Sequence, residues 1–395
     1  MRIGLDILCE VAGRSSGTQT YLEGFLNALA KANDGKHEFF LFVNSSNERH
    51  YRIDDAHFRQ VPFPFSSRTR PLRVLTQLLL IPYHARRLNL DILNFLGTTG
   101  AFLVGCATVQ HVKTLHHLQM PGILDWRSEV FRRLMVGPAA RCADIVIANS
   151  ESQRTDVLNL LKVSPDRVVV VPEAVDHDLF VPKGSGDSYQ GTLAQYGVTH
   201  PYILFVSSLW AHKNAHGLIE AYALLRSRAR FPHKLVIVGG LPARGYHDKL
   251  RRLVAAHRLE DHVQFVGHVS DRRQIRDFYV GAAVFVYASF METFGLTLLE
   301  SMACGTPVVT SNRASMPEVA GDAALIVDPD RPEQIADAIW TLIDDRSTHE
   351  SCTAKGLQRA REFTWERTAR ETLAAYELAY GLRRGGQGAG FSPMI

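Results

Sequence analysis

The chain has 395 residues, of which 46% are hydrophobic and 21% charged. This length predicts two domains, and this composition excludes a wholly disordered chain, a collagen and a coiled-coil rod. Lys and Arg number 44 and Asp and Glu 40, which gives a formal net charge of +4. That bias is too small over this length for a general nucleic-acid-binding protein.

The cysteines and the apolar runs bear on where the protein works. The five cysteines form no C-x-x-C pair, so we expect neither a zinc site nor a disulfide framework. The opening residues MRIGLDILCEVAG contain Asp6 and Glu10 and indicate a strand rather than a secretory signal. The most apolar stretches, 74–83 and 101–109, fall short of the roughly 20 residues that span a bilayer. We expect a cytoplasmic protein without a transmembrane anchor.

Short runs rich in Val and Ile alternate with helix-length amphipathic stretches through the first half. The predicted strands are Ile3–Leu8, Phe39–Val43, Ile92–Phe95, Ala107–His111, Ile145–Ala148 and Val168–Val171. Alternation of this kind predicts an α/β, doubly wound parallel sheet with helices on both faces. Residues 1–182 are the first predicted Rossmann-like domain.

The pattern lapses between Pro182 and Pro201, a stretch rich in Gly, Ser and turn formers, and then resumes. The second series of predicted strands is Ile203–Val206, Leu235–Val238, Val263–Val266, Val284–Tyr287, Val308–Thr310 and Ala324–Val327. Residues 201–364 are therefore the second predicted Rossmann-like domain. The rest of the chain has a helical period, with Pro332 in a first helical turn, and a final helix over 365–382 is expected to pack back on the first domain.

Residues that follow the predicted strands are the candidates for chemistry, because doubly wound sheets bind ligands there and two such domains facing a cleft suit a two-substrate reaction. Glu292 follows one predicted strand, the segment 294–296 enters a helix, and Glu300 lies on that helix. The helix N-terminus offers N–H groups that suit a diphosphate, and the two carboxylates can accept hydrogen bonds from sugar hydroxyls. From spacing alone, a capping acid at Glu292 and a solvated Glu300 explain the pattern equally well.

The segment 286–329 closely resembles the donor-binding signature of the family 4 (group 1) retaining glycosyltransferases of the GT-B fold. Within that family the chain resembles the mannosyltransferases. Glu292 and Glu300 match the E-x7-E pair of that signature. The resemblance implies that Glu292 contacts the transferred sugar and that Glu300 holds the nucleotide ribose. It also implies that backbone amides of Phe294, Gly295, Leu296 and Thr297 serve the sugar and the phosphates. Thr293 stands where the family usually has Gly.

A second matching segment leaves a strand, turns at Ser207 and Ser208, and presents Lys213 just before a helix. A lysine there can stabilise the charge on a departing diphosphate, although a solvated loop lysine has the same pattern. The resemblance assigns Lys213 to the donor phosphates and places Ser208 in the donor site. Ser207 replaces the usual Gly of the family, and His212 replaces a common Arg.

Two further strand ends belong to the expected donor site. FVGHVSD, 265–271, resembles the family segment that cradles the nucleotide base around Gly267 and His268. VIVGG, 236–240, ends in glycines that allow a close backbone approach at Gly239, and a plain turn explains this pattern as well. Contacts of this kind come from the backbone, so they leave the identity of the base open.

In the first half, the segment 13–29 resembles the family's G-G-x-G-R-Y loop, with Gly17 matching and Gln19 in place of a glycine. His111 ends a predicted strand whose family counterpart usually reads H-D, and Val112 replaces the Asp. The resemblance places Gly17 at the donor phosphates and His111 over the sugar at the reaction centre. Because the neighbouring histidines have no metal-ligand spacing, no metal is expected.

The segment 66–90 carries no acid and five arginines, namely Arg68, Arg70, Arg73, Arg86 and Arg87. A second basic helix begins at Trp126. Basic amphipathic stretches bind anionic lipid headgroups, but core-facing helices with arginines that reach the surface have the same composition. Contact with an anionic membrane is therefore one of two interpretations.

Together these features predict a retaining hexosyltransferase that moves a hexose, with mannose as one candidate, from a nucleoside diphosphate sugar to a sugar hydroxyl. The expected acceptor is a glycan or lipid-linked oligosaccharide in surface polysaccharide synthesis, bound by the domain 1–182, while 201–364 binds the donor. A GDP- or UDP-hexose is the expected co-substrate, without a tightly bound cofactor, nucleic acid or metal. The expected place is the cytoplasm or the inner face of its membrane. The alternatives are a GT-B sugar epimerase or phosphorylase, and a catalytically weak protein that binds nucleotide sugars.

Overall fold

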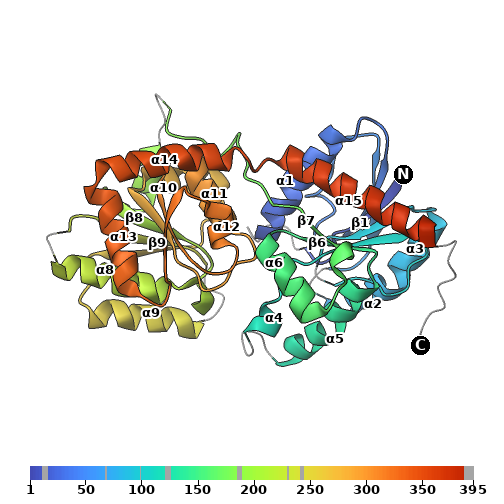
Figure 1. Ribbon diagram of the computed structural model, residues 1–395, viewed down its shortest axis with the longest axis horizontal. Coiled ribbons are helices and arrows are strands. Elements are labelled where there is room, and N and C mark those ends of the chain that lie inside the picture. The colour runs from blue at the N-terminus through green and yellow to red at the C-terminus, as the bar shows by residue number, and fades with distance from the viewer. Residues whose placement is uncertain are drawn as a thin grey trace. The chain divides into compact units, whose positions relative to one another are not determined.

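The computed structural model describes residues 1–10, 17–66, 69–97, 99–120, 126–184, 189–228, 231–240 and 244–386. The chain divides into two compact units. The first consists of Met1–Glu173 with the segment that begins at Trp365, and the second of Ala174–Thr364. Each unit is built on its own parallel sheet (Figure 1).

The first unit has a seven-stranded parallel sheet in the order β3-β2-β1-β4-β5-β6-β7. Its strands are β1 (Arg2–Asp6), β2 (Glu38–Asn44), β3 (Phe58–Phe63), β4 (Ile92–Phe95), β5 (Ala107–His111), β6 (Ile145–Ala148) and β7 (Val168–Val170). All six predicted strands are confirmed. The sequence pattern does not predict β3, because this edge strand is largely exposed and contains Pro62, which an edge position tolerates.

The helices of the first unit are α1 (Gly17–Ala32), α2 (Arg70–Leu75), η1 (Thr76–Leu80), α3 (Ile81–Arg87), α4 (His116–Gln119), α5 (Trp126–Cys142), α6 (Glu151–Asp156), η2 (Val157–Leu161), η3 (Pro165–Arg167) and α15 (Trp365–Gly386). The last helix, α15, packs against α1 and against β4, β5 and β6. Gly24 on α1 makes this approach possible, since a Cβ there would overlap the Trp365 ring.

The second unit has a six-stranded parallel sheet in the order β10-β9-β8-β11-β12-β13. Its strands are β8 (Tyr202–Val206), β9 (Lys234–Val238), β10 (Val263–Gly267), β11 (Val284–Tyr287), β12 (Val308–Ser311) and β13 (Ala324–Val327). All six are predicted by the sequence pattern. They are mostly buried runs of Val, Ile, Leu and Phe, as expected of a parallel sheet covered on both faces.

The helices of the second unit are α7 (Tyr189–Gln195), η4 (Ala211–Lys213), α8 (Ala215–Arg228), α9 (Arg244–Ala256), α10 (Arg272–Gly281), α11 (Leu296–Ala303), α12 (Met316–Ala320), α13 (Pro332–Asp344) and α14 (Arg346–Ala360). Helix α8 packs against α9 and α13, and α11 packs against α10 and α14. Across the described parts of both units, no helix has the length and hydropathy needed to cross a bilayer.

The boundary between the units lies earlier in the chain than the sequence suggests. Residues 174–182 belong to the second unit, because Val175 and Phe180 are buried in its core and the Phe180 ring lies 6.1 Å from that of Tyr279. Helix α7, which lies in the expected boundary stretch between Pro182 and Pro201, packs against α10.

Candidate active site

The carboxyl ends of β8 and β11 meet where the strand order of the second sheet reverses. These strands are hydrogen-bonded neighbours, and the chain continues from β8 to β9 on one side and from β11 to β12 on the other. In doubly wound sheets this switch point is where ligands bind. Lys213 follows β8 at the end of η4, and Glu292 follows β11. Both therefore lie at the ligand-binding edge of the sheet.

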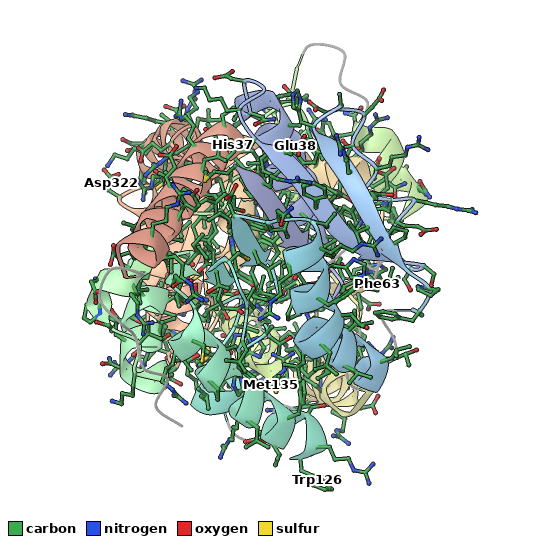
Figure 2. All side chains as sticks on the ribbon, turned by 90° about the vertical axis from the view of Figure 1, so that its right-hand side faces the viewer. His37, Glu38, Phe63, Trp126, Met135 and Asp322 are labelled. Atoms are coloured by element: carbon green, nitrogen blue, oxygen red, sulfur yellow. The ribbon has the colours of Figure 1, made fainter. Side chains whose placement is uncertain are left out.

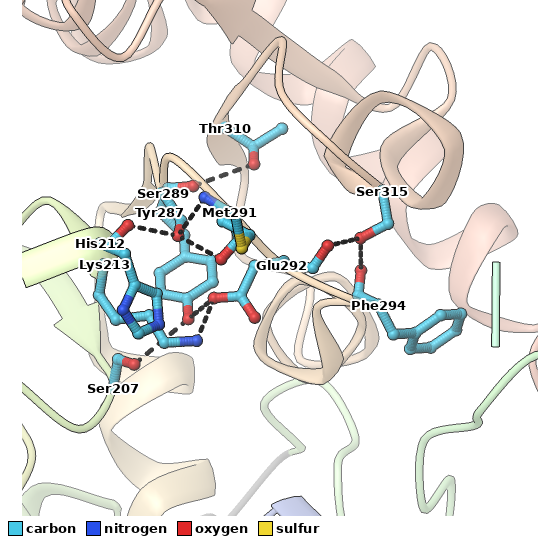
Figure 3. Close-up of polar contacts among 10 residues, drawn as sticks. All are labelled: Ser207, His212, Lys213, Tyr287, Ser289, Met291, Glu292, Phe294, Thr310 and Ser315. Carbon is cyan, nitrogen blue, oxygen red and sulfur yellow. Dashed lines mark hydrogen bonds and ion pairs between the residues drawn. The ribbon is translucent and has the colours of Figure 1, made fainter. Parts of the chain in front are cut away.

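Lys213 and Glu292 form an ion pair at this edge (Figure 3). Nζ of Lys213 donates to Oε1 of Glu292, and the Tyr287 hydroxyl donates to the same oxygen. The side chains of Lys213 and Glu292 are only 14% and 11% exposed. Burial raises the pKa of Glu292, but the Lys213 charge and the hydrogen bonds from Lys213 and Tyr287 outweigh it and hold the pKa below its ordinary value. Glu292 is therefore a carboxylate at neutral pH.

Neighbouring side chains fix the two loops that carry this pair. Asn214 has left-handed backbone, with φ at 60°, and its amide donates to the carbonyl oxygens of Ala288 at 3.0 Å and Pro329 at 2.8 Å. The Ser289 hydroxyl donates to the carbonyl oxygen of His212 at 2.8 Å (Figure 3). The loop after β8 is thus tied to the loop after β11, which is the kind of preorganisation that electrostatic catalysis requires.

Helix α11 begins directly after the Glu292 loop, with Gly295 as its N-cap. Gly295 has φ at +107°, and a Cβ there would overlap the Met316 side chain, so both conformation and packing require glycine. Because glycine offers no side-chain acceptor, the first amides of the helix remain suited to an anion. The Ser315 hydroxyl lies 3.0 Å from the carbonyl oxygen of Glu292 and 2.9 Å from that of Phe294, and so holds the loop (Figure 3). Leu296 and Thr297 form the first turn of α11.

Glu300, on α11, is held by a different set of groups. Nη2 of Arg272 lies 3.1 Å from its Oε1, and the Tyr279 hydroxyl donates to its Oε2 at 3.1 Å. Burial raises the pKa of Glu300, and Arg272 and Tyr279 offset this only in part. Glu300 is buried, so its interpretation as a solvated helix residue is wrong. The interpretation of Glu292 as the capping acid is wrong too, because Gly295 is the N-cap.

Ser208, Gly239 and His268 follow β8, β9 and β10 at the same edge of the sheet. A Cβ at Gly239 would overlap the carbonyl oxygen of Ser207, so glycine is required for a close backbone approach and not merely for a turn. The Gly239 amide donates to the carbonyl oxygen of Gly267 at 2.8 Å. The side chains of Ser208 and His268 are exposed.

In the first unit, His111 ends β5 and is 3% exposed. Its Nε2 lies 3.4 Å from Nδ2 of Asn94, whose amide also donates to the Tyr376 hydroxyl on α15. Burial, and then the charge of Lys113, hold the pKa of His111 well below its ordinary value. His111 is therefore a neutral imidazole at neutral pH, able to accept or donate a hydrogen bond but carrying no charge.

Lys113 lies two residues after His111, next to Val112, which stands in place of the acid of an H-D pair. Its Nζ lies 3.3 Å from Oε1 of Glu173 and 3.0 Å from the centroid of the Tyr21 ring. The amide of Asn149 lies 3.4 Å from the same Glu173 oxygen. Lys113, Asn149 and Glu173 follow β5, β6 and β7, so the first sheet also has charged and amide side chains at its ligand-binding edge.

Gly17 is the first residue of α1, and residues 11–16 before it lie outside the described part of the chain. Its expected contact with donor phosphates stays a prediction. Among the described residues, no group of three or more His, Cys, Asp or Glu side chains is arranged to hold a metal ion.

Tyr287 and Asn214 are among the residues of the site that escape sequence reasoning. Tyr287 ends an apolar strand and has the same pattern as a core residue, so no signal distinguishes it. Asn214 has a signal that could have found it. It stands immediately before α8 and accepts from the Gly217 amide at 3.2 Å, as an N-cap asparagine does.

Two family models match the chain. The model of glycosyl transferases group 1 matches residues 195–359, and that of glycosyltransferase family 4 matches residues 15–179. Solved structures with the same fold include sucrose-phosphate synthase from Thermosynechococcus elongatus, with a TM-score of 0.74, 19% identity, and coverage of 96% of this chain and 99% of that one. Anabaena HepE in complex with UDP and glucose gives a TM-score of 0.70, 20% identity, and coverage of 95% and 99%.

Among curated proteins, O-antigen chain mannosyltransferase B of Escherichia coli is 35% identical over 238 residues, which is 60% of this chain and 61% of that protein. D-inositol 3-phosphate glycosyltransferase of Kineococcus radiotolerans is 33% identical over 264 residues, which is 62% and 60%. The chain thus spans 61% and 60% of the length of these two relatives. The two family models together extend over both units, whose paired parallel sheets are those of the GT-B fold. Residues 195–359 thus form a domain of the glycosyl transferases group 1 family, and residues 15–179 a domain of glycosyltransferase family 4.

Proposed function

We propose that the protein moves a hexose from a nucleoside diphosphate sugar to a sugar hydroxyl, with retention at the anomeric carbon. The observation that carries this proposal is the Lys213–Glu292 pair beside the N-terminus of α11, at the switch point of the second sheet. A cation and unpaired helix amides suit a diphosphate, and an ionised carboxylate suits sugar hydroxyls. HepE, a protein of the same fold, has been solved with UDP and glucose, which supports a GDP- or UDP-hexose as the donor.

In the proposed donor complex, Lys213 and the first amides of α11 bind the diphosphate. Glu292 accepts hydrogen bonds from the transferred hexose, and Glu300 accepts them from the ribose. The exposed ends of β8, β9 and β10, with Ser208, Gly239 and His268, lie beside the nucleotide. Glu292, Glu300 and the first turn of α11 are held in place before the ligand arrives, so little reorganisation of these groups opposes the reaction.

The proposed transfer is a front-face displacement. The bond between the anomeric carbon and the phosphate oxygen breaks, the acceptor oxygen bonds to the same face of that carbon, and the departing phosphate oxygen takes the acceptor proton. Lys213 and the α11 amides stabilise the negative charge that grows on the diphosphate. His111, as a neutral imidazole, orders the reaction centre through hydrogen bonds.

The first unit is proposed to bind the acceptor, a glycan or lipid-linked oligosaccharide in surface polysaccharide synthesis. Similarity to an O-antigen chain mannosyltransferase supports this class of acceptor and mannose as the hexose. A lipid-linked acceptor would bring the enzyme to the inner face of the cytoplasmic membrane, so the first unit should have a surface that can rest on anionic lipid.

Two helical segments of the first unit offer such a surface, and both lie on the face that Figure 2 turns to the viewer. On α2, η1 and α3, an exposed apolar stripe follows helical spacing, with Leu72, Leu75, Leu79 and Tyr83 between 41% and 60% exposed. On α5 a second stripe consists of Trp126, Val130 and Leu134, of which Trp126 is 70% exposed. Exposed arginines accompany both stripes, including Arg86, Arg87, Arg127 and Arg133. Apolar stripes flanked by arginines are typical of helices that lie on anionic membranes.

Turnover of a panel of GDP- and UDP-hexoses tests the proposed function. The protein is incubated with each donor and a mannose-containing oligosaccharide, and products are identified by mass and by the anomeric configuration in proton NMR. We expect transfer with retention, loss of transfer in Glu292→Gln, and full activity in Glu333→Gln, which changes an exposed glutamate on α13. Epimerisation, phosphorolysis or binding without turnover would each contradict the proposed function and support the corresponding alternative, a sugar epimerase, a phosphorylase or a catalytically weak binding protein.

A further inference from the structure

Both hydrogen bonds to the carboxylate of Glu292 end on one oxygen. Lys213 and Tyr287 each donate to Oε1, and within the described residues no hydrogen bond reaches Oε2. A carboxylate held on one oxygen has the other available to a ligand hydroxyl. The two donors differ, since one is a mobile ammonium and the other is a hydroxyl on a buried ring.

The single charge of Lys213 is shared between two anionic partners once a donor is bound. In the proposed function it binds the donor diphosphate, whose charge exceeds that of the Glu292 carboxylate. Once Lys213 turns to the diphosphate, its bond to Glu292 weakens and Tyr287 remains. Tyr287 is then the residue that can keep Glu292 oriented while the sugar is transferred.

The Tyr287 ring is built to stay in place. It is 2% exposed, its centroid lies 5.8 Å from that of Phe205 and 6.0 Å from that of Phe285, and the Thr310 hydroxyl donates to its carbonyl oxygen at 3.0 Å. A phenol ring packed in this way has little rotamer freedom, so its hydroxyl keeps a fixed position from which it can bind the Glu292 carboxylate.

Ser207 extends the contact into a directed chain of hydrogen bonds. Its Oγ lies 3.2 Å from the Tyr287 hydroxyl (Figure 3). A phenol has one proton, and Tyr287 gives it to Glu292, so Ser207 must be the donor in its own bond to Tyr287. Donation from Ser207 polarises the phenol and strengthens its bond to the carboxylate.

We infer that Tyr287, supported by Ser207, is the positioning residue that orients Glu292 in the donor complex after Lys213 has turned to the diphosphate. This inference rests on the proposed function. The charged or titratable groups that face Glu292 are Lys213 and His212 from η4 and Tyr287 from β11.

The test compares Tyr287→Phe with wild type and with a matched control, Tyr202→Phe. Tyr202 lies at the amino-terminal end of β8, where its buried hydroxyl donates to the carbonyl oxygen of Phe278 at 2.7 Å. Loss of a hydrogen bond to a charged group predicts a roughly tenfold or greater fall in kcat for Tyr287→Phe. The KM for the donor should change by less than about twofold, because the ground-state contacts of Lys213 persist. The acidic limb of the plot of kcat against pH should move to higher pH.

The other two variants are expected to behave differently from Tyr287→Phe. Tyr202→Phe should match wild type, and Ser207→Ala should shift the acidic limb in the same direction as Tyr287→Phe but by less.

A second measurement needs no turnover. In protein labelled with carbon-13 at the glutamate carboxyls, the NMR resonance lost in Glu292→Gln identifies Glu292, and its pKa should be higher in Tyr287→Phe and in Ser207→Ala. An unchanged Glu292 pKa, together with unchanged kcat, would overturn the inference. If wild type transfers no sugar from any donor, the proposed function fails, while the NMR titration still decides whether Tyr287 and Ser207 set the state of Glu292.

Discussion

Lys213 and Glu292 stand 79 residues apart in the chain and form a mostly buried ion pair across two neighbouring strand ends. Removing one partner of such a pair leaves the other charge buried and uncompensated, which typically destabilises a protein by about 3–5 kcal/mol. The pair therefore contributes to folding as well as to the proposed chemistry. Variants at these positions need both unfolding and turnover measurements.

Glu292→Gln and Lys213→Ala are each expected to lower turnover by on the order of a hundredfold or more, because each removes a charge that, in the proposed donor complex, faces the reacting sugar phosphate. Lys213→Ala should also be the less stable of the two, since it leaves the Glu292 carboxylate buried without its cation. Turnover at saturating donor and urea unfolding of the same samples measure both effects.

The double variant Lys213→Ala with Glu292→Gln is the control for stability. It should unfold at a higher urea concentration than Lys213→Ala alone, because it removes the uncompensated charge. Near-normal turnover in either folded single variant would contradict its assigned role.

Glu300 should respond differently, because the ribose contact proposed for it is similar in the ground state and the transition state. Glu300→Gln is expected to raise the dissociation constant of the donor more than it lowers kcat. Since burial raises the pKa of Glu300, wild-type affinity should also weaken as the pH falls through that raised value, and the variant should lack this dependence. Calorimetric titration with a nucleoside diphosphate at several pH values measures both, and unchanged affinity in the variant would remove Glu300 from the donor site.

The residues predicted most reliably from the sequence are charged ones at strand ends. Lys213 and Glu292 follow short apolar runs typical of buried strands, and parallel strands bring their carboxyl ends to one edge. The direct pairing of the two side chains could not be predicted in this way. It depends on the order of strands in the sheet, which places β8 beside β11, and no local pattern in the sequence encodes that order.

Residues whose role depends on neighbours distant in sequence escape prediction. Tyr287 has the pattern of a core residue until Ser207 and Glu292 are placed beside its hydroxyl. The pair formed by Lys113 and Glu173 joins two loops 60 residues apart, each unremarkable by itself. Edge strands such as β3 and boundaries such as that at residue 174 likewise follow from packing rather than from periodicity.

Acid should destabilise the first unit through His117, which is 1% exposed on α4. Burial, then the charges of Arg132 and Arg133, lower its pKa from 6.5 to about 4. Between these values the unfolded chain binds more protons than the folded one, so the free energy of unfolding falls as the pH drops from 6.5 towards 4. His117→Gln should flatten this dependence, and His257→Gln, at an exposed position, should not. Urea unfolding at several pH values measures it, and parallel curves for all three proteins would contradict the assignment.

The membrane contact proposed for the exposed stripes on α2, η1, α3 and α5 should depend on both apolar contact and charge. Arg86→Ala with Arg87→Ala should weaken binding to anionic vesicles by about 2 kcal/mol, since each arginine near such a surface contributes roughly 1 kcal/mol, and the difference should shrink in high salt. Leu75→Ser with Leu79→Ser should weaken binding at both salt concentrations, because the buried apolar area does not depend on screening.

Leu378→Ser with Leu382→Ser, on α15, is the matched control, as both leucines are 43% exposed but lie on another helix. Co-sedimentation with neutral and anionic vesicles measures each case. Equal pelleting with both kinds of vesicle, or none with either, would contradict the proposed membrane contact and leave these side chains as ordinary surface residues.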